Sequence, residues 1–299
     1  MGKEAEAEKY LLDFKQLSAN INQYLWNEDD KVYYNYNVPE KKHDKRLLCT
    51  TFDPLQLGIA PADRIEKLIP TLVNPSLFYW GIRPLTTISR TEPGYLEATG
   101  PYDGRAWFGD VWTLRNLSVI NGLEDAGKHD LASELTWATI KTFNSKYCEY
   151  IAPTTGSGEG VQRYGWTASQ YIQAIIENLF GIDYDLQEKR LRIFPHIPRE
   201  LMGKEIEISN LKIPSYNDLR LDLKIMQKEE GKAIISVNFT GELPPDEIVE
   251  IGLPTHEGKP FTAKDKEEKK QYPVKVIDGL TNVSGISLKM KNNIGLVFE

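Results

Sequence analysis

Up to about residue 200, apolar residues recur every three or four positions, which predicts amphipathic helices. Apolar positions cover most of each segment, so these helices are expected to pack on one another. Glycine marks two expected helix ends, because it adopts the left-handed conformation that follows a last turn. The expected helices cover Leu11–Leu25, Ala62–Val73, Trp112 to a stop near Asn121 and Gly122, Leu131–Thr142, and Ala168–Leu179 with Gly181 behind it.

After about residue 200 the period changes to two. Leucine and isoleucine alternate with charged residues from Leu219 to Ile225, the pattern of a half-buried antiparallel strand. The lysine- and glutamate-rich stretch Gly258–Gln271 predicts a solvated loop. We therefore expect an antiparallel β-sandwich of at least six strands, with no helix longer than two turns after Leu219. Similar alternation occurs at Ile235–Phe239, Ile286–Met290 and Leu296–Phe298.

The change of period predicts a multidomain α+β protein. The boundary is expected between Asp183 and Pro198, where the sequence LRIFPHIP leads into the β-rich region. This divides the chain into a helical domain, 1–190, and a β-sandwich domain, 191–299.

Composition excludes several classes of protein. A formal net charge of −7 on 299 residues argues against a nucleic-acid partner, because phosphate binding needs a basic face. No apolar run approaches the roughly 20 residues that span a bilayer, and the first residues resemble no signal peptide, so a cytoplasmic location is expected. Cys49 and Cys148 form no disulfide framework, and the four histidines are scattered, so no metal site is expected.

The segment GPYDGRAWFGDVWTLRN concentrates aromatic and charged residues between two expected helices. Flat aromatic faces stack on the CH face of a sugar ring, while carboxylates and guanidinium groups bond its hydroxyls. Each aromatic taken alone fits a helix-packing core equally well, but the polar neighbours favour a cleft for the whole segment. Its aromatic residues are Tyr102, Trp107, Phe108 and Trp112.

A second segment, CEYIAPTTGSGEGVQRYGWTASQ, places Glu149 after a helix and before a glycine-rich loop. Tyr164 and Trp166 follow at the start of the next expected helix. A carboxylate beside an aromatic wall can be positioned to take a proton from water, although most glutamates are simply solvated. Glu159 lies in the same loop between two glycines, where it is expected to be more mobile and a poorer base.

These segments resemble the clan of inverting α/α-toroid glycosidases that includes processing α-glucosidase I, trehalase and mannosylglycerate hydrolase-like enzymes. The resemblance extends from Tyr10 to Pro198. In the aromatic loop the chain departs from the family, with Phe108 and Asp110 in place of an arginine and a proline. The matching segments are Leu25–Asn37, Phe52–Ala60, Gly81–Tyr95, Trp107–Asn116 and Glu149–Ser169.

The resemblance implies hydrolysis of an α-linked gluco- or manno-configured oligosaccharide or disaccharide with inversion, and no metal or organic cofactor. It places the general base on Glu149. Tyr102 belongs to the same sugar site. Trp107, Trp112 and Trp166 are expected to form its walls, and Arg105 and Asp110 to bond hydroxyls.

A complete (α/α)6 toroid needs about twelve helices, and no segment matches the family's general-acid motif. The chain is therefore expected to form the C-terminal half of a toroid, a partial toroid followed by the β-sandwich. The acid would come from an upstream segment or a companion chain, or from Asp103 or Asp110. A partial toroid also predicts a homo-oligomer or a companion that completes the ring. The alternatives are a non-catalytic carbohydrate-binding or regulatory subunit and a truncated relict of such an enzyme.

Overall fold

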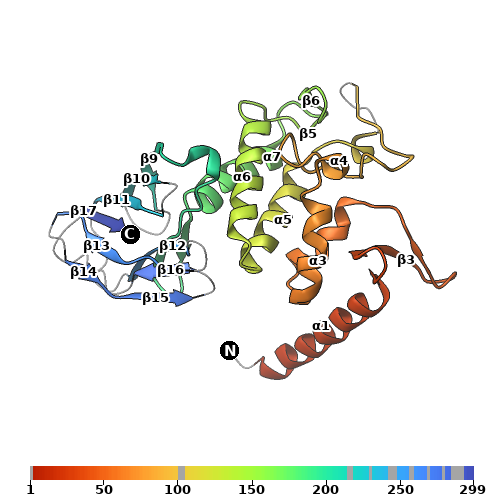
Figure 1. Ribbon diagram of the computed structural model, residues 1–299, viewed down its shortest axis with the longest axis horizontal. Coiled ribbons are helices and arrows are strands. Elements are labelled where there is room, and N and C mark those ends of the chain that lie inside the picture. Colours follow the sequence, from red (N-terminus) through yellow and green to blue (C-terminus); the bar gives the residue numbers. More distant parts are fainter. Residues whose placement is uncertain are drawn as a thin grey trace. The chain divides into compact units, whose positions relative to one another are not determined.

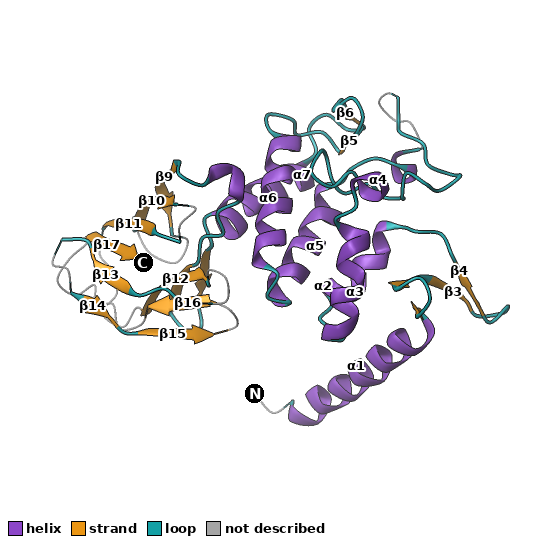
Figure 2. Ribbon diagram, viewed as in Figure 1, coloured by secondary structure: helices purple, strands orange, loops and turns teal. Residues whose placement is uncertain are grey.

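The chain folds as two compact units, Met1–Tyr171 and Ile172–Glu299. The computed structural model describes residues 3–99, 105–213, 218–228, 231–241, 248–255, 259–267, 270–277, 280–283 and 293–299. Helices dominate the first unit and strands the second (Figures 1 and 2). The fold is therefore mixed α and β, as the change of period near residue 200 predicts.

The five longer helices of the first unit overlap the segments that the apolar period predicts, whereas the four-residue helices α2 and α4 were not expected. Helix α7 begins three residues earlier than expected and continues as a π-helical segment, Ala174–Leu179. Gly181 follows with a φ of +65°, the left-handed conformation expected of it. The helices are α1 (Glu4–Tyr24), α2 (Asp53–Gln56), α3 (Ala62–Leu72), α4 (Pro75–Phe78), α5 (Thr113–Asp125), α6 (His129–Phe143) and α7 (Gly165–Gln173).

Helix α5 does not stop near Asn121 and Gly122, so that expectation is wrong. The helix continues to Asp125 because Gly122 serves close packing and not termination. A Cβ at Gly122 would lie 2.6 Å from the backbone nitrogen of Gln56, so α2 crosses α5 where α5 has no side chain. Helix α6 then runs back beside α5 after a three-residue connection (Figure 1).

Helix α1 departs from the expectation that all these helices pack on one another. None of its residues is buried, although it carries the predicted apolar stripe. Its attachment lies at its carboxyl end, where Asn22 donates to Ile59 O (2.8 Å) and accepts from Tyr33 Oη (2.7 Å). The exposed apolar residues on α1 are Tyr10, Leu11, Leu12, Phe14, Leu17 and Tyr24.

Short antiparallel strand pairs connect the helices of the first unit. The pairs are β1 (Trp26–Asn27) with β2 (Val32–Tyr33), β3 (Asn35–Asn37) with β4 (Lys42–Asp44), and β5 (Tyr150–Ile151) with β6 (Gly158–Glu159).

The second unit contains two sheets. In the first, strands run in the order β14-β13-β17-β11-β10-β9, and in the second β15-β16-β12-β8-β7 (Figure 1). Alternate residues are buried along β10, β11 and β17, as a period of two requires. The strands are β7 (Ile182–Asp185), β8 (Arg190–Ile193), β9 (Glu205–Lys212), β10 (Arg220–Gln227), β11 (Ala233–Thr240), β12 (Ile248–Pro254), β13 (Ala263–Asp265), β14 (Gln271–Tyr272), β15 (Val274–Ile277), β16 (Leu280–Val283) and β17 (Asn293–Phe298).

Two details of the β-rich unit correct the sequence analysis. The pairing is not wholly antiparallel, because β8 and β12 pair in parallel. The stretch Gly258–Gln271 is not only a loop, because β13 lies within it and pairs with β17, with Ala263 fully buried. The run Ile286–Met290 lies outside the described residues. In the described part of 219–299 there is no helix, as predicted.

The expected domain boundary at 190/191 falls inside the β-rich unit. That position lies in β8, which pairs with β7 and β12 of the same sheet. The unit therefore begins before the strands that the alternating pattern revealed. Within the described residues, every helix is too short or too polar to cross a membrane.

Gly122→Ala is expected to lower the free energy of unfolding. Alanine favours a helix over glycine by up to about 1 kcal/mol, but the new methyl group would meet the Gln56 backbone, and overpacking typically costs about 1–3 kcal/mol. Chemical denaturation measures the difference, and Asp125→Ala, at an exposed position of the same helix, is the control, expected within about 0.5 kcal/mol of the parent. Higher stability of Gly122→Ala would contradict the close α2–α5 approach.

Candidate active site

Three segments that are distant in sequence meet at the main chain of Val111. Val111 N donates to Ile151 O (2.9 Å) and Ile151 N donates to Val111 O (3.0 Å), an antiparallel bridge. A second antiparallel bridge pairs Val111 with Thr86. The aromatic loop is thereby aligned with β5, the strand that follows Glu149 directly.

Asn116 anchors the third of these segments from helix α5. Its Nδ2 donates to Pro84 O (2.7 Å) and to Thr139 Oγ1 (2.9 Å), and its Oδ1 accepts from Leu85 N (2.8 Å). Asn116 is fully buried, so these bonds replace those it would make to water. This asparagine of the family-like segment therefore has a structural role.

Glu149 lies at the entrance of the β5–β6 hairpin. Its side chain is half-buried, and its Oε2 accepts from Val161 N (3.1 Å), beyond the far end of β6. The Glu149 carbonyl accepts from Thr167 Oγ1 (3.5 Å) in helix α7. The hairpin and the first turn of α7 thus hold the residue from two sides.

Three alternating glycines bring the returning strand onto this carboxylate. A Cβ at Gly160, where φ is +70°, would lie 2.7 Å from Glu149 Oε2 and 2.6 Å from the Tyr150 ring. A Cβ at Gly158 would lie 2.6 Å from Cys148 Sγ, and one at Gly156 would lie 2.9 Å from Arg83 Nε. The glycine-rich loop of the sequence is therefore a closely packed hairpin.

The aromatic residues form a stack beside Glu149. The Trp107 and Trp112 rings lie 4.2 Å apart at 15°, and Trp112 lies 5.1 Å from the Tyr150 ring. Trp112 is 4% exposed and its Nε1 donates to Ala106 O, whereas Trp107 is 49% exposed. Trp107 is therefore the ring in this stack with a face open to a ligand, while Trp112 supports it.

Trp166 also offers an exposed ring. It is 53% exposed at the start of α7, near the Tyr164 ring at 6.4 Å. Tyr164 N donates to Tyr147 O (2.7 Å), which holds the start of α7 against the residues just before Glu149.

The polar residues expected to contact a sugar are less exposed than Trp107 and Trp166. Asp110 is completely buried, and both its carboxylate oxygens lie within hydrogen-bond distance of Ala98 N (3.1 and 3.3 Å), so it braces the loop. Arg105 is half-buried and donates to Thr99 Oγ1 (2.9 Å). Tyr102 and Asp103 lie outside the described residues.

Two other carboxylates belong to this region. The sequence analysis expected Glu159 to lie in a mobile loop, because glycines flank it. The structure instead places it in β6 opposite Tyr150, where it is only 9% exposed. Glu97, which the sequence analysis missed, accepts hydrogen bonds from Tyr95 and Thr154. A glutamate between two motifs gives little signal in the sequence, because most glutamates are solvated.

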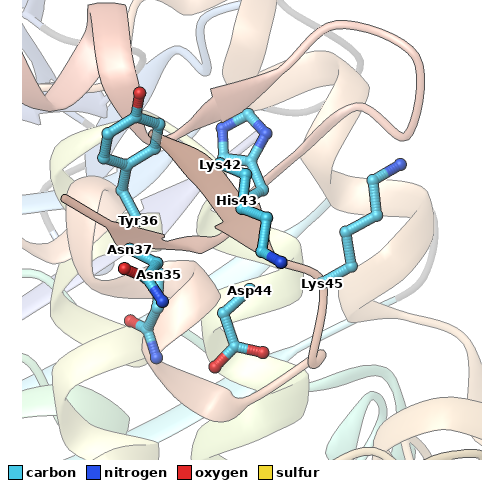
Figure 3. Close-up of a pocket in the computed structure, with 7 residues that line it drawn as sticks. All are labelled: Asn35, Tyr36, Asn37, Lys42, His43, Asp44 and Lys45. Carbon is cyan, nitrogen blue, oxygen red and sulfur yellow. The ribbon is translucent and has the colours of Figure 1, made fainter. Parts of the chain in front are cut away.

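A separate polar pocket lies at the β3–β4 hairpin (Figure 3). Its charged side chains already have partners: Lys42 pairs with Glu40 at 2.6 Å, Lys45 with Asp30 at 2.7 Å, and Asp44 with Arg46. No residue predicted for the site belongs to it. Its lining residues are Asn35, Tyr36, Asn37, Lys42, His43, Asp44 and Lys45.

Comparison with known families gives a match over more than half of the chain. The family described as "Mannosylglycerate hydrolase MGH1-like glycoside hydrolase domain" matches residues 1–167. The match contains four of the five family-like segments and ends within the fifth, Glu149–Ser169. The resemblance to α/α-toroid glycosidases is thus confirmed.

Curated relatives and a solved structure add to this match. A mannosylglycerate hydrolase of Rubrobacter radiotolerans is 27% identical over 54% of this chain and 36% of its own length. A periplasmic trehalase of Citrobacter koseri is 24% identical over 56% of this chain and 29% of its own length. The chain therefore spans less than half the length of these relatives. A solved structure described as a sialidase has a TM-score of 0.61 at 14% identity, over 80% of this chain and 23% of that chain, a likeness of fold alone.

Gly160→Ala is expected to destabilise the first unit more than a matched glycine substitution elsewhere. Gly127 has nearly the same φ, +68°, but open space around it, so Gly127→Ala reports the backbone strain alone. Gly160→Ala adds the collision with Glu149 and Tyr150, about 1–3 kcal/mol. Denaturation curves compare the two variants, and equal losses would show that β6 does not press on Glu149.

Proposed function

Since the chain belongs to the mannosylglycerate hydrolase MGH1-like glycoside hydrolase family, we propose that it carries the general base of an inverting glycosidase and that Glu149 is that base. In such an enzyme one carboxylate activates water while a carboxylic acid on the opposite face of the sugar protonates the leaving oxygen. The single observation that carries the proposal is the position of Glu149, held by the hairpin beside a stack with an exposed tryptophan.

The hydrogen bonding of Glu149 suits a base. Val161 N binds Oε2, and among the described residues no donor lies within hydrogen-bond distance of Oε1. A carboxylate fixed through one oxygen keeps its orientation, and the other oxygen remains able to accept a proton from water.

Asp110 is poorly placed to be the general acid. Asp110 faces the interior and binds Ala98 N, so its placement does not suit proton transfer to a leaving group. We propose that another segment or a companion chain supplies the acid and completes the toroid of which these helices form a part. The exposed apolar residues of α1 favour such a partner, because large exposed apolar patches mark interaction surfaces.

For the substrate we propose an α-linked gluco- or manno-configured disaccharide or oligosaccharide. Two curated relatives are named for the hydrolysis of mannosylglycerate and of trehalose, which makes both compounds the first to test. The exposed faces of Trp107 and Trp166 would stack on the sugar, and the half-buried Arg105 would bond its hydroxyls. The reaction would take place in the cytoplasm and use no metal or organic cofactor.

A non-catalytic carbohydrate-binding subunit is the second candidate. It is favoured by the combination of an intact aromatic stack with an Asp110 that cannot reach a ligand. Binding of the same sugars without turnover, in the presence of any partner that purifies with the chain, would identify it.

Glu149→Gln is expected to reduce turnover by about 10²–10⁴-fold while leaving sugar binding and stability unchanged. The amide has nearly the same shape, and its oxygen still accepts from Val161 N. The assay follows hydrolysis of mannosylglycerate and trehalose by the full gene product with any co-purifying chain. Glu159→Gln, in the same hairpin, is the control and should retain activity. Full activity of Glu149→Gln would remove Glu149 from the mechanism and make Glu159 the next candidate.

Trp107→Ala is expected to weaken sugar binding roughly fivefold, because one stacking contact is worth about 1 kcal/mol. Calorimetry against glucose, mannose, trehalose and maltose measures the effect. Tyr10→Ala, which removes an exposed aromatic from α1, should leave affinity unchanged. No binding by the folded parent across this panel, or equal affinity of parent and Trp107→Ala, would count against the aromatic stack as the sugar site.

A further inference from the structure

Glu97 binds the turn that closes the β5–β6 hairpin. Its Oε2 accepts from Thr154 N (3.1 Å), and its Oε1 accepts from Thr154 Oγ1 (2.5 Å), Tyr95 Oη (2.6 Å) and Tyr79 Oη (3.3 Å). Tyr79 Oη also lies 2.8 Å from Thr154 Oγ1, so the single Tyr79 proton is shared between that oxygen and the carboxylate. One half-buried carboxylate thus collects four donors, two of which belong to the same residue of the turn.

Cationic side chains bind the carbonyl groups of the same turn. Arg83 Nη1 lies 2.7 Å from Pro153 O and 3.3 Å from Thr154 O, and Lys146 Nζ donates to Gly156 O (2.7 Å). The Arg83 guanidinium also fills the space that a side chain at Gly156 would need. The turn is therefore held through its donors by an anion and through its acceptors by two cations.

Glu97 is ionised at neutral pH. Burial acts to raise its pKa, but the hydrogen bonds from Thr154, Tyr95 and Tyr79 outweigh burial and hold the pKa of this carboxyl below its ordinary value. An ionised carboxylate cannot donate a proton to a leaving group, so Glu97 does not replace the missing acid.

We propose that Glu97 is a positioning residue that fixes the β5–β6 hairpin, and with it Glu149, through the Thr154 turn. The inference rests on the proposed role of Glu149 as the general base. Thr154 lies three residues after β5 ends and four before β6 begins, so movement of this turn moves both strands of a two-residue pairing. Such a short ladder has little stability of its own, and the turn contacts supply what the ladder lacks.

The expected kinetic effect follows from geometry. Displacement of a catalytic group by about 1 Å can cost on the order of 10²-fold in rate, so Glu97→Ala should lower kcat by about 10–100-fold. KM should change less, because Glu97 acts through the hairpin and not on the sugar. Glu97→Gln keeps an oxygen for Thr154 N and a polar group for the three hydroxyls, and should recover part of the lost kcat.

A cysteine in this region gives a readout that needs no activity. Cys148 is 2% exposed and packs beneath Gly158 of β6, so its thiol becomes accessible when the hairpin opens. The chain has two cysteines, and Cys49, also buried, lies in the turn before α2. Cys49→Ala leaves Cys148 as the reporter of the hairpin, and Cys148→Ala leaves Cys49 as the reporter of the rest of the first unit.

The test measures the rate of thiol labelling by a disulfide reagent in both backgrounds, together with kcat and KM. Glu97→Ala should speed labelling of Cys148 by about 10–100-fold, the factor expected on loss of hydrogen bonds to a charged group, and leave Cys49 labelling unchanged. Glu92→Ala is the matched control, because Glu92 is half-buried and accepts from Leu47 N (2.9 Å) but does not touch the turn. It should not speed labelling of Cys148.

Four results would overturn the inference: unchanged labelling of Cys148 in Glu97→Ala, equal acceleration of both cysteines, a raised KM with kcat intact, or unchanged kcat and KM. The second would show a general loss of stability, and the third a contact with substrate. Failure of the proposed function looks different, since Glu149→Gln would then stay active whatever the labelling shows. If Glu149→Gln is inactive and Glu97→Ala is fully active, Glu149 remains the base and the positioning role of Glu97 is refuted.

Discussion

The main-chain pairing of Val111 with Ile151 is the contact on which the candidate site depends. Two hydrogen bonds, of 2.9 and 3.0 Å, fix the aromatic loop against β5 and so determine how far Trp107 lies from Glu149 along the two segments. Main-chain bonds of this kind are insensitive to side-chain identity. The Val111–Ile151 pairing therefore places no demand on the side chain of Phe108.

Some side chains around that pairing are buried and stabilise the converging segments, and others are exposed and accessible to a ligand. Asp110, Asn116 and Trp112 are buried and satisfy or cover the backbone of the converging segments. Trp107 and Trp166 keep about half of their surface exposed. In the proposed site few side chains are open to a ligand, and the buried Asp110 and Asn116 secure the path of the aromatic loop.

Periodicity predicts the five longer helices and the strands β10, β11 and β17, because burial of one face is a local property of the sequence. It fails where a distant partner decides the outcome. Asn121-Gly122 is a typical sequence for a helix end, but Gly122 lies against α2 inside the helix. Helix α1 carries an apolar stripe, but among the described residues nothing buries it. Residue type alone likewise could not separate Trp107 from Trp112, since one ring covers the other, nor reveal Glu97, whose role comes from a turn 57 residues away.

The alternating glycines of the hairpin have a consequence for how such a chain can evolve. Gly156, Gly158 and Gly160 each face an atom that leaves no space for a Cβ, respectively in Arg83, Cys148 and Glu149. Substitutions are therefore confined to the intervening positions. Insertion of a single residue between two of these glycines would shift at least one of them off its contact and bring a side chain there. The segment can therefore vary at the positions between its glycines but not in length. The spacing of the glycines, more than any acidic residue, would identify this hairpin in a distant homologue.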